Sequence, residues 1–192
     1  YILSKSRQDF KILANQVFCK SDDLNDIILP ISFDETKEAS KMNIATRLSA
    51  LNFLDNGGAI GVFPGGTVST AQNPFGVPMD PGWRSFTAKM ITRSDAQVVP
   101  IFFEGHNSRL FQVASHIHYN LRMGLLIKEF KSKVGNPVKI AIGNPLSDTA
   151  IKSRSGNPRI LMDFLREETY KLSRTPLDNF NYGYEFESRY KI

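Results

Sequence analysis

Short apolar runs alternate with stretches of helical periodicity along most of the chain. Three of the early runs predict buried strands: Phe10–Ala14, Ile27–Ile31 and Ala59–Phe63. Between the second and third run, apolar residues recur at helical spacing and predict a long helix, with a cap at Asp34 or Thr36 and an end at Gly57-Gly58. The positions expected to face the core are Ile44, Leu48, Leu51 and Leu54. This order of elements is typical of a right-handed crossover, so the flanking strands are expected to run parallel.

The second half of the chain continues the alternation. A helix is expected around Trp83, Phe86 and Met90, and another over Ser108–Leu126. Further elements are predicted as a strand Val98–Phe103, which should neighbour Ala59–Phe63, a strand Val138–Ile142, and a last helix from Ile160 to Leu172. The pattern predicts an α/β fold, a single domain over residues 1–192 with a largely parallel mixed sheet flanked by helices. Residues 177–192 form an aromatic, polar tail without a period.

Composition and charge restrict the functional class of the protein only in part. The 192 residues carry 24 Lys and Arg against 19 Asp and Glu, a net charge of +5. This basic excess suits a membrane surface, an acidic carrier protein, nucleic acid or a phosphorylated small molecule, and does not choose among them. Cys19 is the only cysteine, so no internal disulfide is expected. No apolar run is long enough to span a bilayer, and the opening Tyr1-Ile2-Leu3-Ser4 resembles the tail of a helix, which suggests a fragment.

The run Ala59–Phe63 leads directly into Pro64-Gly65-Gly66-Thr67-Val68-Ser69-Thr70. These small residues let backbone N–H groups approach a ligand, and the carboxyl end of a strand is where α/β sheets bind ligands. The loop lacks the Lys of a nucleotide-binding P-loop, and the chain contains neither Gly-x-Gly-x-x-Gly at a strand-to-helix turn nor Gly-x-Ser-x-Gly. His116 and His118 are two residues apart, so on a helix they would point to different faces, and no metal site is expected. No cofactor is expected either.

Phe63-Pro64-Gly65-Gly66-Thr67-Val68-Ser69 resembles the Phe-Pro-Glu-Gly-Thr-Arg-Ser block of glycerolipid and lysophospholipid acyltransferases. The order of the neighbouring segments is also similar to that family over residues 1–147. The segments are Ile28–Ile31 with residues 32–35 at the acceptor-site block, Trp83–Phe86 with its basic residue, and Val98–Ile101 at the Val-Pro-Val strand. The continuation Phe103–Phe111 resembles the bacterial hemolysin-like or ornithine-lipid branch.

The resemblance implies an enzyme that moves an acyl group from acyl carrier protein or acyl-CoA to the hydroxyl of a lyso-lipid in membrane lipid biosynthesis. It implies a peripheral protein on the cytoplasmic face of the inner membrane, with the membrane surface as a partner and no role for nucleic acid. In such a family a His, oriented by an Asp, removes the acceptor proton, and N–H donors stabilise the oxyanion.

Three departures from the family pattern stand out. The positions five residues after His106, His116 and His118 hold Phe111, Leu121 and Met123, so the His-x4-Asp block is absent from the chain. By the resemblance, the catalytic His and Asp are expected before Tyr1. Gly65 and Val68 stand where the block has Glu and Arg, which disfavours glycerol-3-phosphate or lysophosphatidic acid as the acceptor and leaves room for another headgroup.

The substrate-binding residues expected on this basis fall into three groups. The first could seat the acceptor or the oxyanion, or form an ordinary tight turn: Phe63, Pro64, Gly65, Gly66, Thr67 and Ser69. Arg84 and Lys89 could bind an anionic headgroup or the phosphopantetheine of the donor, or belong to a solvated helix face. His106 could line the crevice beside the loop, or be a hydrogen-bonded structural residue.

Other interpretations remain open at this point. The apolar segment Leu121–Phe130, with its basic flanks, could rest on a membrane or belong to the core with solvated Arg and Lys. The chain could also be a non-catalytic lipid- or carrier-binding module of the acyltransferase fold. A third alternative is an unrelated α/β enzyme that binds a nucleotide or phosphorylated metabolite at the glycine loop.

Overall fold

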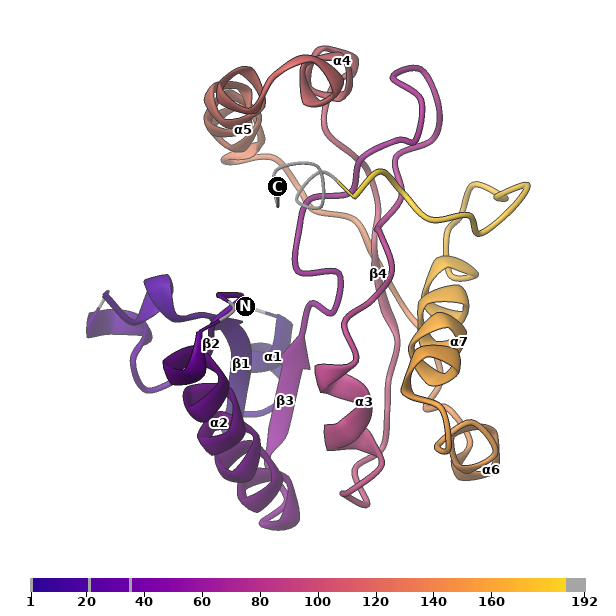
Figure 1. Cartoon of the computed structure of the whole chain (residues 1–192). Helices are drawn as coiled ribbons and strands as arrows, with labels where there is room; N and C mark the ends of the chain where they lie inside the picture. Colours follow the sequence, from indigo (N-terminus) through magenta and orange to yellow (C-terminus); the bar gives the residue numbers. More distant parts are fainter. Residues whose placement is uncertain (1, 21, 35, 186–192) are drawn as a thin grey trace. The chain divides into compact units, whose positions relative to one another are not determined.

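The structure of the protein is a computed structural model that describes residues 2–20, 22–34 and 36–185. Residues 1, 21, 35 and 186–192 lie outside this set. Parts of the predicted helix tail at the start of the chain and of the predicted C-terminal tail therefore fall on residues that are not described. Contacts divide the chain into two compact units, one of residues 1–64, 85–98 and 148–158 and one of residues 65–84, 99–147 and 159–192. The α/β class is confirmed, because a parallel sheet flanked by helices forms the first unit (Figure 1).

The first unit is organised around three parallel strands in the order β2-β1-β3. In the register of this sheet, Leu13 of the central strand lies opposite Leu29 on one side and Val62 on the other. The bounds of its elements are α1 Ile2–Ser6, β1 Phe10–Asn15, two 3₁₀ helices Gln16–Lys20 and Asp22–Leu24, β2 Ile28–Ile31, α2 Lys37–Asp55, β3 Ala59–Val62, α3 Phe86–Ile91 and α6 Asp148–Lys152. The predicted parallel arrangement of β2 and β3 is therefore confirmed, with β1 between them.

Helix α2 covers one face of this sheet, and Figure 1 shows α1 on the other. Its cap is Thr36, whose Oγ1 accepts a hydrogen bond from the Ala39 N–H at 3.0 Å. The prediction that Ile44 and Leu48 face the core is wrong, since they are 48% and 61% exposed. The buried side of α2 consists of small residues that let the helix approach the sheet closely: Ala39, Thr46 and Ala50.

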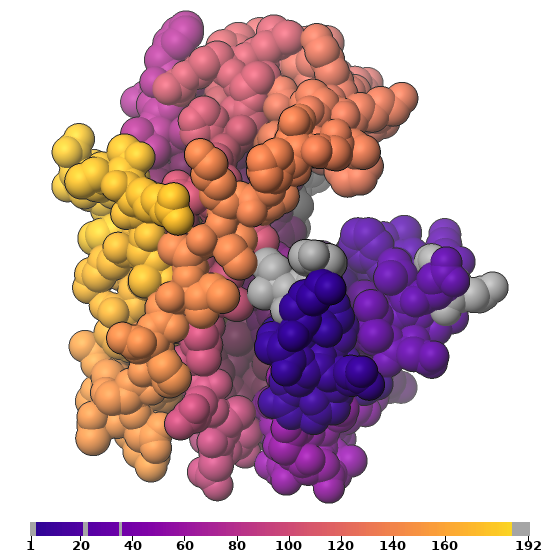
Figure 2. Space-filling model, turned by 180° about the vertical axis from the view of Figure 1, so that it is seen from behind, coloured from indigo at the N-terminus to yellow at the C-terminus, as the bar shows by residue number. Residues whose placement is uncertain are grey.

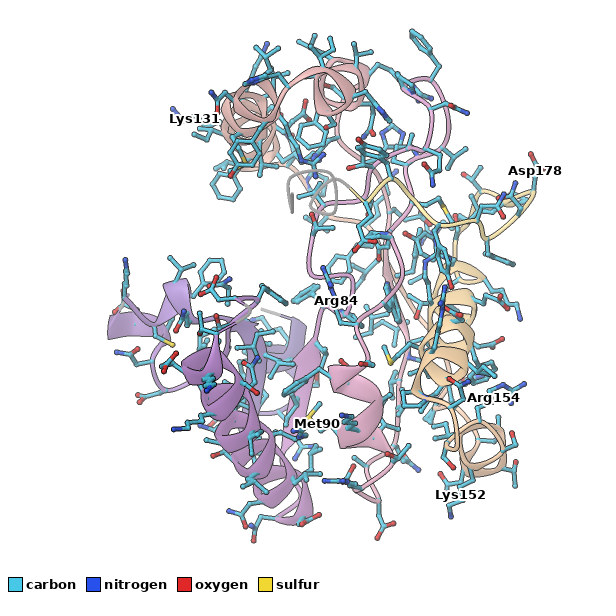
Figure 3. All side chains as sticks on the ribbon, viewed as in Figure 1. Arg84, Met90, Lys131, Lys152, Arg154 and Asp178 are labelled. Carbon is cyan, nitrogen blue, oxygen red and sulfur yellow. The ribbon has the colours of Figure 1, made fainter. Side chains whose placement is uncertain are left out.

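The core of the first unit lies between α2, α3 and the sheet. Its buried members are Leu13, Leu29, Ala50 and Met90, and Figure 3 shows Met90 projecting from α3. Helix α3 begins only at Phe86, so the prediction that places Trp83 on this helix is wrong. Pro30 occupies the edge strand, as expected, and its carbonyl oxygen accepts a hydrogen bond from Thr46 Oγ1 at 2.6 Å.

The second unit contains a two-stranded antiparallel sheet, with Ile101 opposite Ile142 and Phe103 opposite Ile140. Its elements are β4 Ile101–Phe103, α4 Arg109–Ile117, α5 Tyr119–Lys133, β5 Ile140–Ile142 and α7 Pro158–Tyr170. Both strands are shorter than predicted. The predicted pairing of the first with β3 is not confirmed, because among the described residues β4 is hydrogen-bonded to β5 instead. Pro100 precedes β4 and has no N–H to donate to a ladder.

The helix predicted over Ser108–Leu126 is divided at His118. The backbone of His118 is extended, at φ −155° and ψ 143°, so it ends α4 and caps α5 at the same time. Its Nδ1 accepts a hydrogen bond from the Asn120 N–H at 3.1 Å. This side chain stabilises the start of the second helix, and sequence periodicity alone does not reveal the break.

Helix α7 packs with Leu161, Met162 and Leu165 buried and ends at Tyr170, two residues before the predicted limit. The chain beyond it has no helix or strand up to residue 185, in agreement with the predicted lack of period.

Candidate functional site

The glycine loop of the second unit, residues 65–70, lies against the carboxylate of Asp80. Ser69 Oγ donates a hydrogen bond to Asp80 Oδ1, and Trp83 Nε1 donates to Asp80 Oδ2 at 2.9 Å. A Cβ atom at Gly65 would lie 3.2 Å from Asp80 Oδ2, tighter than an ordinary contact. Gly66, with a φ of +66°, adopts the left-handed conformation that favours glycine. The missing side chain at Gly65 thus leaves room for a carboxylate from a later segment.

The backbone of Asp80 is held as firmly as its side chain. Its N–H donates to Tyr170 Oη at 2.8 Å, and its carbonyl oxygen accepts from Arg166 Nη2 at 2.9 Å. Burial raises the pKa of Tyr170 to about 12, and the nearby Asp80 charge adds to the shift. Tyr170 is therefore a neutral hydroxyl at ordinary pH, and Asp80 is fixed on both sides.

Arg122 of α5 anchors the far end of the glycine loop. It is 4% exposed, and its Nη1 donates to Thr70 Oγ1 at 2.9 Å and to Ser115 Oγ at 2.6 Å. The Arg122 guanidinium also lies over the ring of Phe111, 4.8 Å from its centroid. The cation couples the loop to α4 and α5, so the position of the loop depends on both helices.

The segment after α7 forms the other support of the loop. Gly183 N–H donates to the Asp80 carbonyl at 2.8 Å, and Tyr184 N–H donates to the Thr70 carbonyl at 2.9 Å. A Cβ at Gly183 would overlap the carbonyl oxygen of Met79, so only glycine fits there. The aromatic tail is therefore part of the loop's framework, although its sequence has no period.

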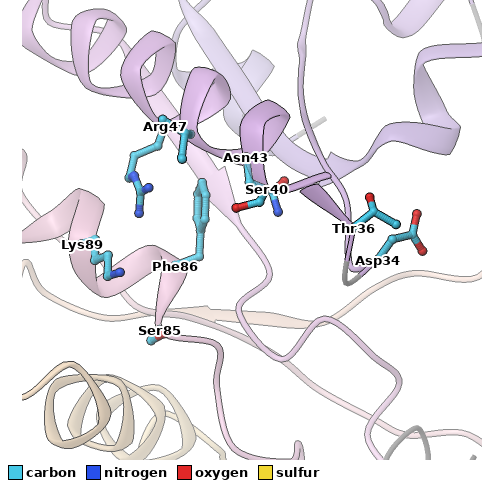
Figure 4. Close-up of a pocket in the computed structure, with 9 residues that line it drawn as sticks. Asp34, Thr36, Ser40, Asn43, Arg47, Ser85, Phe86 and Lys89 are labelled. Carbon is cyan, nitrogen blue, oxygen red and sulfur yellow. The ribbon is translucent and has the colours of Figure 1, made fainter. Parts of the chain in front are cut away.

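The first unit contains a cavity of about 450 Å³ between α2 and α3 (Figure 4). Its lining residues are Asp34, Thr36, Ser40, Asn43, Ile44, Arg47, Ser85, Phe86 and Lys89. Figure 4 shows Arg47 and Lys89 with Phe86 at one end and Asp34 at the other. The Arg47 guanidinium lies 5.5 Å from the centroid of the Phe86 ring. Within the described part of the chain, neither Arg47 nor Lys89 forms an ion pair with an acidic side chain.

The expected substrate-binding residues are distributed over both units. Phe63 and Pro64 follow β3 in the first unit, where Lys89 lines the cavity. In the second unit, the structure brings Gly65 and Ser69 together around Asp80, with Gly66 and Thr67 between them in the loop. The role of Lys89 in binding an anionic headgroup or phosphopantetheine, and the role of the loop in binding the acceptor or the oxyanion, stay predictions.

Arg84 and His106 lie in the second unit with other partners. Arg84 pairs with Glu185 at 3.6 Å, and both side chains are more than a third exposed, so the pair contributes little to stability. His106 is exposed, its Nδ1 lies 2.9 Å from the Asn107 carbonyl oxygen, and its own carbonyl accepts from Lys133 at the end of α5. These bonds favour the structural interpretation of His106.

The other two histidines also bind backbone atoms. His116 Nε2 lies 2.9 Å from the carbonyl oxygen of Ala71, and its ring stacks on Tyr184 at 4.5 Å between centroids. His118 caps α5. In the described ranges, no group of three or more His, Cys, Asp or Glu side chains is placed to hold a metal ion. No helix within those ranges is long and apolar enough to cross a bilayer.

Comparison with known families finds a match to a family model described as acyltransferase, over residues 3–179. The chain belongs to the acyltransferase family. A search of curated proteins and a search of solved structures both give no match. Family membership confirms the resemblance at the level of the family and supports acyl transfer as the general chemistry. It contradicts the third alternative, an unrelated α/β enzyme.

Several residues of this acyltransferase that shape the loop and the cavity carry no signal in the sequence. Arg47 lies on α2 between Ile44 and Leu48, and nothing in its spacing marks it as a cavity residue. Asp80 lies in Pro78-Met79-Asp80-Pro81-Gly82, a composition that indicates only a turn. Arg122, Arg166 and Tyr170 act through contacts far apart in sequence, which no local motif encodes.

Proposed function

We propose that the protein transfers an acyl group from acyl carrier protein or acyl-CoA to the hydroxyl of a lyso-lipid in membrane lipid biosynthesis. The observation that supports the proposal is the glycine loop, whose sequence resembles the family block and which is held against a fixed carboxylate. A glycine-rich backbone presents N–H groups to an oxyanion with little steric hindrance. The residues proposed for this seat are Gly65, Gly66, Thr67 and Ser69.

The acceptor proton needs a base, because a lipid hydroxyl is a poor nucleophile until it is deprotonated. Each histidine of this chain uses a ring nitrogen to bind a backbone atom. We therefore assign the base to none of them and propose the His-x4-Asp pair that the family resemblance places before Tyr1. The acceptor oxygen would attack the thioester carbonyl carbon while its proton passes to that His, the C–S bond would break, and the His would return the proton to the leaving thiolate.

The carboxylate of Asp80 favours an acceptor other than a phosphate monoester. In the family block a Glu and an Arg stand where this chain has Gly65 and Val68, so the loop itself supplies no cation. Asp80 instead places a carboxylate beside Gly65, which favours a hydroxyl or an ammonium group at that end of the loop, whereas the buried Arg122 is already bound to Thr70 and Ser115 at the other end. This supports a lyso-lipid with an amine-bearing headgroup, as in the hemolysin-like or ornithine-lipid branch.

The cavity of the first unit fits the phosphate-bearing part of the acyl donor. Both acyl-CoA and acyl carrier protein present phosphopantetheine, and two cations with hydroxyl groups nearby are typical of phosphate recognition. Arg47 and Lys89 supply the cations, and Ser40, Thr36 and Ser85 supply the hydroxyls. A volume of about 450 Å³ lies within the range of small-molecule sites.

A second candidate is a non-catalytic module that binds lipid or carrier without turnover. The departures at Gly65 and Val68 favour it, because they remove two charged side chains from the family block. For either candidate, the proposed location is the cytoplasmic face of the inner membrane, where a peripheral protein would meet both a lyso-lipid and a soluble donor.

The test is an acyl-transfer assay on the full-length gene product, with acyl-CoA and acyl carrier protein as alternative donors. Lysophosphatidic acid and an amine-bearing lyso-lipid serve as acceptors, and mass spectrometry detects the product. In the same assay, Asp80→Asn should lower kcat/KM for the amine-bearing acceptor by about tenfold or more, because it removes the charge and keeps the shape. Gly156→Ala is the matched control, since a Cβ there meets no atom within 4 Å. Turnover with neither acceptor would favour the non-catalytic module.

A further inference from the structure

Helix α5 has an inverted distribution of polar and apolar side chains. Its buried residues are Arg122 and Glu129, both charged. Glu129 accepts hydrogen bonds from the N–H and Oγ of Ser108, while Arg122 binds Thr70 and Ser115. The inward side of the helix is therefore occupied by a polar network.

The outward side of α5 carries an apolar stripe, which consists of Met123, Ile127, Phe130 and Val134. Their exposed fractions are 40%, 61%, 72% and 67%. The spacing of four, three and four residues places them along one side of the helix and its end, about 120° around the axis from Arg122 and Glu129. At 1.5 Å per residue the stripe extends over about 16 Å. Side chains this large and this exposed, in one row, are typical of a binding surface.

Lysines flank the apolar stripe. Lys128 and Lys131 are exposed, and Figure 3 shows Lys131 projecting outward from α5. Lys133 at the end of the helix donates to Asn107 Oδ1. The only acidic residue in the helix is the buried Glu129, so its exposed charge is wholly positive. Figure 2 shows the segments of α4 and α5 in coral at the upper end of their unit.

We infer that the apolar stripe of α5 docks on an anionic lipid surface, with Met123, Ile127, Phe130 and Val134 entering the headgroup region. Two features of the stripe fit this partner. Transfer of the apolar side chains out of water lowers the free energy of the bound state, and the flanking lysines are attracted to negative headgroups. A helix that presents apolar side chains and only positive charges to solvent is suited to lying in an anionic interface. The burial of Arg122 contradicts the solvated Arg of the alternative in which this segment belongs to the core.

An acidic protein such as a carrier could also attract the lysines. A lipid surface is favoured because the stripe has four apolar side chains in line along the helix axis, which suits a plane better than a localised protein contact. The inference deepens the proposed function, since it gives the surface by which an enzyme of lyso-lipids would reach its acceptor. It rests on the geometry of α5 and not on any assumption about turnover.

The test is co-sedimentation of the full-length gene product with vesicles of phosphatidylcholine that contain 30% phosphatidylglycerol, about the anionic content of a charged leaflet. Binding is expected to these vesicles and to be much weaker with pure phosphatidylcholine or at high salt. Ile127→Ser and Phe130→Ser should each weaken binding by about tenfold, from loss of apolar burial. Leu48→Ser is the matched control, because Leu48 is also 61% exposed but lies on α2.

Equal vesicle binding by Phe130→Ser and Leu48→Ser would overturn the inference. Binding to an acidic carrier protein that the stripe variants abolish, without binding to vesicles, would also overturn it and assign the surface to a protein. These outcomes are distinguishable from failure of the proposed function. Acyl transfer to a lyso-lipid supplied in detergent micelles does not depend on docking and is measured separately. Circular dichroism of each variant checks that a loss of binding does not come from unfolding.

Discussion

Gly183 provides a direct test of the framework that holds the glycine loop. A methyl group at this position would overlap the Met79 carbonyl oxygen and lie 2.6 Å from that of Thr70, both of them backbone atoms that cannot rotate away. In Gly183→Ala the segment must move outward, which loses the hydrogen bonds from Gly183 N–H to Asp80 and from Tyr184 N–H to Thr70. Arg166, which donates to the carbonyls of Phe180 and Asn181 in the same segment, would be strained as well.

The cost follows from these contacts. Overpacking of a tight site costs about 1–3 kcal/mol, and each of the two lost backbone hydrogen bonds adds about 1 kcal/mol, so we expect a loss of about 3–5 kcal/mol in the free energy of unfolding. For a chain of this length, that corresponds to a fall in Tm of roughly 6–20 °C. The assay is urea denaturation followed by fluorescence of Trp83, which hydrogen-bonds Asp80 beside the displaced segment. The midpoint should fall while the m-value stays the same.

The matched control is Gly124→Ala, because Gly124 is exposed on α5 and a Cβ there meets no atom within 4 Å. In a helix interior this change should raise the free energy of unfolding by about 0.5–1 kcal/mol. The two glycine-to-alanine substitutions therefore have opposite expected signs. A Gly183→Ala variant as stable as wild type would refute the placement of the tail between Thr70 and Asp80.

Two further predictions concern pH and ligand binding. The pKa of Tyr170 is raised to about 12 from 10, so the stability it contributes is fully present below pH 10 and is lost as pH rises from about 10 to 12. Up to about 3 kcal/mol should disappear over this window in wild type. Tyr170→Phe should lack that decline, although it is less stable at pH 7 because the Asp80 N–H loses its acceptor. Equal alkaline slopes in the two proteins would contradict the burial of this hydroxyl. In the cavity, Arg47→Ala and Lys89→Ala should each weaken binding of CoA about 10–100-fold in calorimetry, whereas Lys41→Ala, on the same helix but outside the cavity, should leave it unchanged. If the variant that combines Arg47→Ala and Lys89→Ala binds CoA as tightly as wild type, the proposal that the acyl donor binds in this cavity is wrong.

The sequence was sufficient to predict elements whose signal is local. The strands β1, β2 and β3, the helix between the last two and its cap at Thr36 all follow from apolar runs, a capping residue and a glycine pair. The family resemblance, which rests on an ordered set of short blocks, is confirmed at the level of the family. These features need no knowledge of which side chains meet in space.

The sequence was insufficient to predict features that depend on packing between segments far apart in the chain. Ile44 and Leu48 have the right spacing for a core face, but small residues such as Ala50 let α2 approach the sheet on another side. The break at His118 depends on a single extended residue inside a continuous periodic stretch. Asp80 and Gly183 meet the glycine loop from segments far along the chain, so their importance is visible only in three dimensions.

The central claim is that this member of the acyltransferase family acylates a lyso-lipid at the glycine loop. The most direct measurement is the rate of acyl transfer by the full-length gene product to an amine-bearing lyso-lipid, compared between wild type and Asp80→Asn. The proposal expects measurable product from wild type with at least one of the two donors, and at least about a tenfold lower kcat/KM in the variant. No product with either donor and any acceptor, from a protein that is folded and binds lipid, would contradict it.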